Sequence, residues 1–175
     1  MAQRHQEYLD AGAIVAAIVR DTPQQNAAMV EKLRLPFPIL SDPTRDLAIR
    51  PYLASDEGDP RDIATPTTVV IGPDGSEVWR HQSSDFGDRP PEDGALDEVR
   101  RLGLDPASQP APNPGDPQPG PKAMPLNELA PYYRGAKFGS VIADKRFPDI
   151  HDGLEKFRSM LDGYIEAVGK LQSDG

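Results

Sequence analysis

The sequence contains no cysteine in its 175 residues. This absence excludes disulfides, thiolate metal sites and thiol nucleophiles in this chain. The sequence also lacks a long apolar run, since none approaches the roughly 20 residues that a membrane-spanning helix needs. The first residues lead into no apolar stretch of the signal-peptide type. We therefore expect no membrane partner and a cytoplasmic protein.

Positive charge is scarce. The 19 Lys and Arg residues are outnumbered by 28 Asp and Glu residues, which gives a formal net charge of -9 and a pI near 4.8. Nucleic-acid binding requires clustered basic residues that neutralise phosphates. We therefore expect no nucleic acid as a partner.

The chain is rich in proline and lean in hydrophobic residues. It has 20 Pro, 15 Gly and 37% hydrophobic residues, so part of it cannot belong to a core. We expect an α/β domain over residues 1–104, a Pro-rich linker over 105–125 and a C-terminal helical extension over 126–175. The eight prolines of the linker favour extended polyproline II, which makes it a spacer or a strap. An SH3-like groove is an alternative partner for this segment.

Local signals predict the first elements of the domain. Gly12 fits the left-handed position after a helix, and residues 13–19 form a near-continuous apolar run typical of a central parallel strand. Thr22 is suited to cap a helix that begins at Pro23 and continues to residue 33. Residues 36–40 predict an edge strand, because prolines cannot donate to a ladder.

The second half of the domain follows the same logic. Ser41 and Asp42, residue types that cap helices, stand before Pro43 and predict a helix over residues 44–53. Residues 67–71 and 77–81 predict a hairpin around a Gly-Pro-Asp-Gly turn. Apolar residues at 96, 99 and 102 predict an amphipathic helix.

The C-terminal region predicts one strong helix. Residues 126–142 are aromatic and interrupted by Gly135 and Gly139, whereas residues 150–171 keep helical apolar spacing. The apolar face of this helix needs a cover. We expect it on the domain's own sheet or on a second copy of the chain.

Three segments carry a resemblance to a known family. Residues 12–21 hold the apolar run and its turn, residues 35–43 read Leu-Pro-Phe-Pro-Ile-Leu-Ser-Asp-Pro, and residues 65–75 read Thr-Pro-Thr-Thr-Val-Val-Ile-Gly-Pro-Asp-Gly. In this order they resemble the peroxiredoxin-like redoxins, the alkyl hydroperoxide reductase and thiol-specific antioxidant family. The resemblance implies an α/β fold: a partial thioredoxin-like fold, with a mixed sheet and flanking helices.

The family's active-site segment has no match here. Its peroxidatic cysteine lies in a Pro-x-x-x-Thr/Ser-x-x-Cys loop at the start of the helix that residues 1–11 resemble in its last part. The family strand leading into that loop lies between the strands that match residues 14–19 and 67–71. Without it, the two strands close up, another chain donates a strand, or the sequence is N-terminally truncated. We favour truncation of a longer product.

The resemblance also places a substrate groove. Pro66 matches the family's cis-proline, so Thr65, Pro66 and Thr67 would line the groove and the bond between residues 65 and 66 would be cis. Without the resemblance, a proline at this place is an ordinary junction between a loop and a strand.

Arg80 is the fourth groove candidate, because related proteins place a basic residue of the returning strand near the peroxide site. Successive strand residues point to opposite faces, so only one of Trp79 and Arg80 faces the core. The residue types favour a packed Trp79 and a solvated Arg80.

No other cluster predicts a catalytic or metal site. The three histidines, His5, His81 and His151, fall in different elements and are expected at the surface. One acidic loop lacks the ligand order of a calcium site; its members are Asp56, Glu57, Asp59 and Asp62. Ser83 and Ser84 near His81 lack the strained turn of a nucleophile. We expect no metal, no cofactor and no catalytic residue.

The resemblance implies an antioxidant oxidoreductase that reduces hydroperoxides with a cysteine thiolate. A thioredoxin-type reductant would be the partner of the complete protein. Because this chain has no cysteine, we expect it to be inactive. The alternative is a non-catalytic thioredoxin-fold binding module that kept the groove and lost the thiol.

Overall fold

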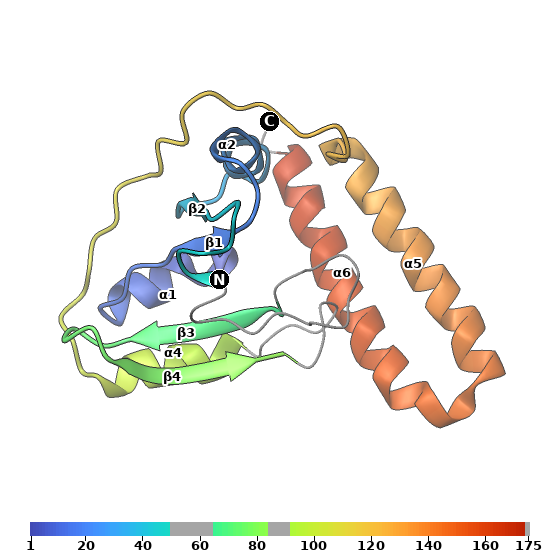
Figure 1. The fold of residues 1–175 in the computed structure, drawn as a ribbon. Coiled ribbons are helices and arrows are strands. Elements are labelled where there is room, and N and C mark those ends of the chain that lie inside the picture. Colours follow the sequence, from blue (N-terminus) through green and yellow to red (C-terminus); the bar gives the residue numbers. More distant parts are fainter. Residues whose placement is uncertain (50–64, 84–91, 174–175) are drawn as a thin grey trace. The chain divides into compact units, whose positions relative to one another are not determined.

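A computed structural model of the chain describes residues 1–49, 65–83 and 92–173. The chain divides into two compact units, one of residues 1–31 and 35–118 and the other of residues 32–34 and 119–175. The first unit holds the strands and shorter helices, and the second is dominated by two long helices (Figure 1). The predicted α/β class is confirmed.

The first unit begins with a short 3-10 turn, η1 (Ala2–Arg4), and helix α1 (His5–Asp10). Gly12 follows the helix with φ +91°, and its N–H donates to the carbonyl of Leu9 at 3.0 Å. The predicted left-handed position is confirmed. A neighbouring segment also comes close here, because a Cβ on Gly12 would lie 2.5 Å from the Cβ of Leu104.

Strands β1 (Ala17–Val19) and β2 (Ile39–Ser41) pair in parallel. Both are shorter than the predicted segments 13–19 and 36–40. The prolines at 36 and 38 explain the difference, because they lack the N–H that a longer ladder would require. The prediction of a central strand is wrong as well, since among the described residues β1 pairs with β2 alone.

Helix α2 (Pro23–Leu33) starts where the sequence predicts. The hydroxyl of Thr22 accepts the N–H of Gln25 at 3.3 Å, and the side-chain oxygen of Gln25 accepts the N–H of Thr22 at 2.9 Å. This reciprocal pair is a capping box. Ala27 and Val30 are buried on the predicted apolar face.

The predicted helix over residues 44–53 does not start at its expected position. Residues 43–48 form turns, Arg45 has φ +64°, and only Ile49 is helical before the described segment ends. The cause is Asp42, whose buried carboxylate accepts the N–H groups of residues 47–49 at 3.3, 2.9 and 2.9 Å. A side chain that binds these donors competes with helical hydrogen bonding. The rest of the predicted helix lies outside the described residues.

The predicted hairpin is confirmed. Strand β3 (Thr67–Ile71) pairs antiparallel with β4 (Glu77–Gln82), with an irregularity after Val70. Its turn is closed by Gly75 at φ +82° and by Asp74, whose carboxylate accepts the N–H of Ser76 at 3.0 Å.

Helix α4 (Glu92–Arg101) covers one face of this hairpin and buries Ala95, Leu96 and Val99. The side chain of Trp79 on β4 lies against Gly94 of this helix. One core cluster joins α1, α4 and both pairs of strands; its buried members are Tyr8, Val15, Phe37, Val70, Ala95, Leu96 and Val99. The strands themselves stay in two separate sheets among the described residues, β1 with β2 and β3 with β4. Of the predicted alternatives, closure of the two pairs into one sheet is therefore not seen among the described residues.

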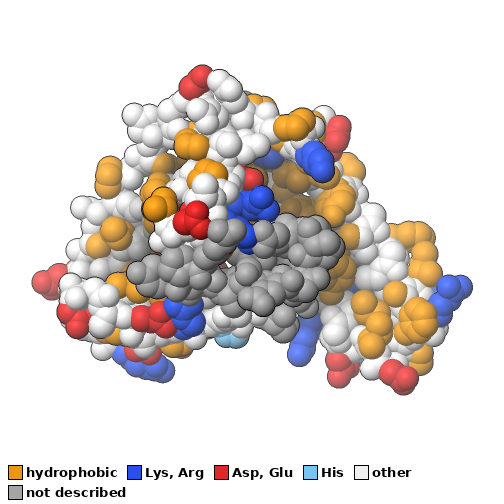
Figure 2. All heavy atoms as spheres, viewed as in Figure 1, with side chains coloured by type: hydrophobic (Ala, Val, Ile, Leu, Met, Phe, Trp, Pro, Cys, Tyr) orange, Lys and Arg blue, Asp and Glu red, His pale blue; other side chains and the backbone are white. Residues whose placement is uncertain are grey.

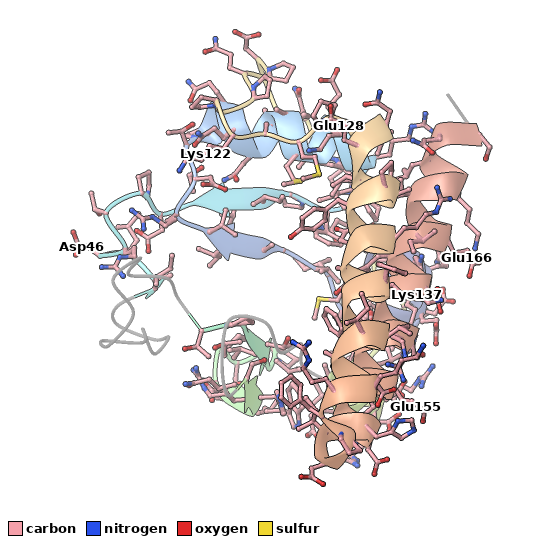
Figure 3. All side chains as sticks on the ribbon, turned by 90° about the vertical axis from the view of Figure 1, so that its right-hand side faces the viewer. Asp46, Lys122, Glu128, Lys137, Glu155 and Glu166 are labelled. Carbon is pink, nitrogen blue, oxygen red and sulfur yellow. The ribbon has the colours of Figure 1, made fainter. Side chains whose placement is uncertain are left out.

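The second unit is a helical hairpin of α5 (Leu126–Arg146) and α6 (His151–Ser173), joined through η2 (Pro148–Ile150). The two long helices lie side by side, with Lys137 and Glu155 labelled on them (Figure 3). The predicted interruption of residues 126–142 is wrong, because α5 continues through both glycines. Each interior glycine costs only about 1 kcal/mol relative to alanine, and contacts with α6 offset that cost.

Polar and aromatic contacts fix the pairing of the two helices. Lys137 donates to the carboxylate of Asp162 at 2.6 Å, and Arg158 donates to that of Asp144 at 2.9 Å. The rings of Tyr133 and Tyr164 lie 5.3 Å apart. Partners late in α5 thus meet residues early in α6, which makes the pair antiparallel. The partner of α6 within its unit is therefore α5, which the sequence analysis did not predict.

Several large apolar side chains of this hairpin stay exposed. Phe138 is 68% exposed, and Ile142, one helical turn later, is 50% exposed. Hydrophobic side chains are visible at the surface over α5 and α6 (Figure 2). Two helices alone cannot enclose all the apolar surface that they carry.

Candidate functional site

The candidate groove residues lie at the start of β3. Thr65 is buried, and its carbonyl accepts the hydroxyl of Thr67 at 3.0 Å. The carbonyl of Pro66 accepts the N–H of Ser83 at 2.9 Å, which extends the pairing with the segment after β4. Pro66 has no N–H to donate, so the regular strand starts only at Thr67. The three residues therefore form a fixed, hydrogen-bonded junction.

The predicted isomer of this junction is wrong. No cis peptide bond occurs among the described residues, so the bond between Thr65 and Pro66 is trans. The expectation came from the resemblance, whereas a trans bond is the ordinary state of most X–Pro bonds. The junction therefore lacks the cis-proline on which the groove assignment relied.

Arg80 lies on β4 opposite Val69 of β3. The next pair along the ladder on that face is Thr67 with Gln82, so Arg80 and Thr67 are diagonal neighbours on one face of the hairpin. The structure thus brings one strand residue of the predicted groove to the same face as Arg80. Trp79 belongs to the opposite face, which packs on α4.

The guanidinium of Arg80 forms a two-point ion pair with Glu77. Its Nε donates to one carboxylate oxygen at 2.8 Å and its Nη2 to the other at 2.5 Å. The hydrogen bonds of this pair raise the pKa of Arg80 and lower the pKa of Glu77. The charge that would attract an anionic substrate is therefore neutralised by a neighbour on the same strand.

Two further side chains stand near the site. The ring of His81 stacks on Trp79 with centroids 6.2 Å apart. The hydroxyl of buried Ser83 makes no hydrogen bond with any described residue. Ser84 lies outside the described residues.

No metal centre emerges from the part of the chain that the structure describes, where no three His, Asp or Glu side chains gather to hold an ion. The predicted acidic loop, with Asp56 and Glu57, lies outside that part. The expectation that all histidines are at the surface is wrong for His5, which is buried. Its ring nitrogen instead meets the side chain of Gln109 at 3.0 Å. No helix of the described segments is long and apolar enough to cross a membrane.

A comparison with family models matches residues 1–78 to the AhpC/TSA family. These residues, less than half of the chain, are similar to that family. No curated protein and no solved structure matches the chain. The AhpC/TSA segment ends within β4 and includes the junction at Thr65 but not Arg80. The family match, together with the helices and small sheets described above, identifies the first unit as a partial thioredoxin-like fold.

The segment similar to the AhpC/TSA family lacks the family's reactive group, since the whole sequence has no cysteine. Of the predicted groove residues, Thr67 and Arg80 share a face, whereas Thr65 is buried. Sequence reasoning missed the role of Gln109. It lies in the Pro-rich segment, and no local pattern marks it as a partner of a segment 94 positions away.

Proposed function

We propose that this chain is a redoxin-family module without thiol peroxidase activity of its own, which acts by binding rather than by redox chemistry. The observation that carries the proposal is the absence of cysteine from all 175 residues. Peroxide reduction in this family uses a thiolate as nucleophile, and a neutral hydroxyl is a far poorer nucleophile. The occupied guanidinium of Arg80 and the trans bond at Pro66 support the same proposal.

A second candidate is the family's own activity, thiol-dependent reduction of hydroperoxides, with the thiolate supplied by a segment outside this sequence. The match of residues 1–78 to the AhpC/TSA family favours it. On this hypothesis a thioredoxin-type protein would be the reductant of the complete protein.

A coupled assay tests the first proposal. The chain is mixed with hydrogen peroxide or an organic hydroperoxide, thioredoxin, its reductase and NADPH, and the loss of NADPH is followed. We expect NADPH to be lost no faster than in a control with the heat-denatured chain. Turnover above that control by the chain alone would contradict the proposal.

A fusion separates the two candidates. The strand, cysteine loop and helix of a redoxin relative are joined in front of Met1, and a Cys→Ser version of the same fusion is the matched control. Cysteine-dependent turnover would favour the family activity. A folded fusion that stays at the rate of its Cys→Ser control would favour the binding module.

A further inference from the structure

The segment before β1 has backbone hydrogen-bonding groups that β2 does not pair, because β2 begins only at Ile39. The N–H of Ala17 donates to the carbonyl of Pro38 at 3.1 Å, and the carbonyl of Val19 accepts the N–H of Asp42 at 2.8 Å. Both residues therefore direct their backbone groups toward β2. In an extended chain every second residue repeats this direction, so Val15 faces the same side. There the neighbouring segment is Pro36–Phe37–Pro38, and β2 has not yet begun.

The side chain of Gln109 takes the place of the absent strand residue. Its Oε1 accepts the N–H of Val15 at 2.9 Å, and its Nε2 donates to the carbonyl of Val15 at 2.7 Å. Since only the oxygen can accept and only the nitrogen can donate, these two bonds fix the orientation of the amide. Val15 is only 7% exposed, so without Gln109 both backbone groups would be buried and unpaired.

His5 completes the arrangement. Its Nε2 lies 3.0 Å from the Oε1 of Gln109, and because that oxygen accepts, this ring nitrogen donates. The Gln109 side chain thereby joins α1, the segment before β1 and the Pro-rich segment. It is the one residue described here that hydrogen-bonds to both His5 and Val15.

Backbone bonds hold the Pro-rich segment on either side of Gln109. The N–H of Ala107 donates to Leu9 at 2.8 Å, and the N–H of Gln118 donates to Gln24 at 3.0 Å. Between them, residues 112–114 line one wall of a groove of about 400 Å³ whose other walls are α2 and β2. Of the two predicted alternatives, spacer and strap, these contacts favour a strap for residues 105–118.

Proline explains why the strap can lie there without becoming a strand. Prolines lack the N–H that a ladder needs, so the strap satisfies Val15 through a side chain and offers few donors of its own. Among the described residues, backbone bonds hold the strap at residues 107 and 118. Between them, the side chain of Gln109 makes the bonds to the buried backbone of Val15.

We propose that residues 105–118 form a releasable strap, held closed over the groove between α2 and β2 by the side-chain amide of Gln109. When the amide leaves Val15, the strap detaches from residue 107 onward, and the groove loses its third wall. The strap is thus a conformational device of the first unit and is independent of any redox chemistry.

Native-state amide hydrogen exchange on the full chain tests this proposal. In Gln109→Ala, the amides of Val15 and Ala107 should exchange at least about tenfold faster, as loss of two buried hydrogen bonds predicts, while Trp79 on the hairpin of β3 and β4 keeps its protection. Gln118→Ala is the matched control, because Gln118 binds Gln24 through its backbone N–H. In this variant the amides of Val15 and Ala107 should exchange at the wild-type rate. An unchanged Val15, or a uniform acceleration across the unit, would overturn the proposal.

A second variant keeps the test decisive if Gln109→Ala does not fold. Ala107→Pro removes the other strap bond near this end without touching the amide. We expect it to leave Val15 protected. Deprotection of Val15 in Ala107→Pro would show that the strap is not held by Gln109, and the proposal would fail.

A thiol probe measures release directly, because the chain has no cysteine of its own. In Ala27→Cys, whose side chain is buried in the groove that the strap covers, labelling by a thiol reagent reports opening of the strap. Labelling should be slower than in the urea-unfolded protein and should accelerate when Gln109→Glu is added, since a carboxylate cannot donate to the Val15 carbonyl. Equal rates with and without Gln109→Glu would contradict the proposal.

Discussion

At the scale of single residues, Gly12 combines a left-handed backbone with a close neighbour. Its φ is +91°, and an added Cβ would lie 2.5 Å from a Leu104 atom and 2.8 Å from the backbone oxygen of Asp105. Gly12→Ala should therefore lose more than the roughly 1–2 kcal/mol that left-handed alanine costs alone. Urea unfolding measures the loss.

Gly75→Ala is the matched control for Gly12. Gly75 has φ +82° but no atom within 4 Å of an added Cβ, so this variant should show the backbone cost without the clash. Equal unfolding midpoints for the two variants would show that the approach of residues 104 and 105 to Gly12 yields easily in solution.

Asp42 links stability to pH. Burial opposes its ionisation, but backbone hydrogen bonds from residues 45 and 47–49 outweigh burial and hold the pKa of the carboxyl below its ordinary value of 3.8. A lowered pKa means that the stabilisation is complete above the unfolded pKa and is lost as the pH falls through the folded one. Asp42→Asn should lower the urea midpoint at pH 7 and flatten the acid branch of the stability curve.

The measurement for Asp42 is the urea midpoint between pH 7 and pH 2 for both proteins. Asp10→Asn is a control, because Asp10 accepts one exposed hydrogen bond, from Gln6, which the amide oxygen of asparagine can still accept. If Asp42→Asn keeps the wild-type midpoint at neutral pH, the carboxylate does not hold the turn at residues 43–48 as described.

At the scale of elements, α5 contains glycines that its packing does not need. Gly135 and Gly139 have no atom within 4 Å of an added Cβ, and neither has a positive φ. Gly139→Ala should therefore stabilise the helical hairpin by about 0.5–1 kcal/mol. Thermal unfolding followed on the helices checks this. A lowered midpoint would show that the glycine allows a closer helix approach than described.

Elements that depend on nearby residues could be predicted from the sequence, and those that depend on distant partners could not. The capping box at Thr22, the left-handed Gly12 and the hairpin turn at Asp74 each involve groups within four positions of one another. The shortening of β1, in contrast, depends on prolines some twenty residues later in the chain.

The same difference applies to the candidate site. Alternation along β4 correctly placed Trp79 and Arg80 on opposite faces, although both are half-buried and Arg80 is not fully solvated as predicted. The resemblance directed attention to the junction at Thr65. The isomer at Pro66 was wrong, because it followed the family rather than any physical need of this chain. The contact between Gln109 and Val15 spans 94 positions, and no periodic pattern encodes a single long-range amide.

At the scale of the whole molecule, acidity governs solubility. The formal net charge is -9 at pH 7, and the pI is near 4.8. Repulsion between like-charged molecules vanishes near the pI, and exposed apolar side chains on α5 are then free to associate. Turbidity should rise sharply near pH 4.8 and fall again toward pH 7, where the formal net charge is -9. Equal clarity at pH 4.8 and pH 7 would contradict this.

The position of Trp79 has an optical consequence. It is the chain's one tryptophan, and it lies in the first unit against Gly94 and the ring of His81. Its fluorescence therefore reports on the hairpin and α4, and no indole emission comes from α5 or α6. Far-UV circular dichroism, in contrast, is weighted toward those two long helices. The two signals recorded on one sample would follow the two units separately, without any label or added probe.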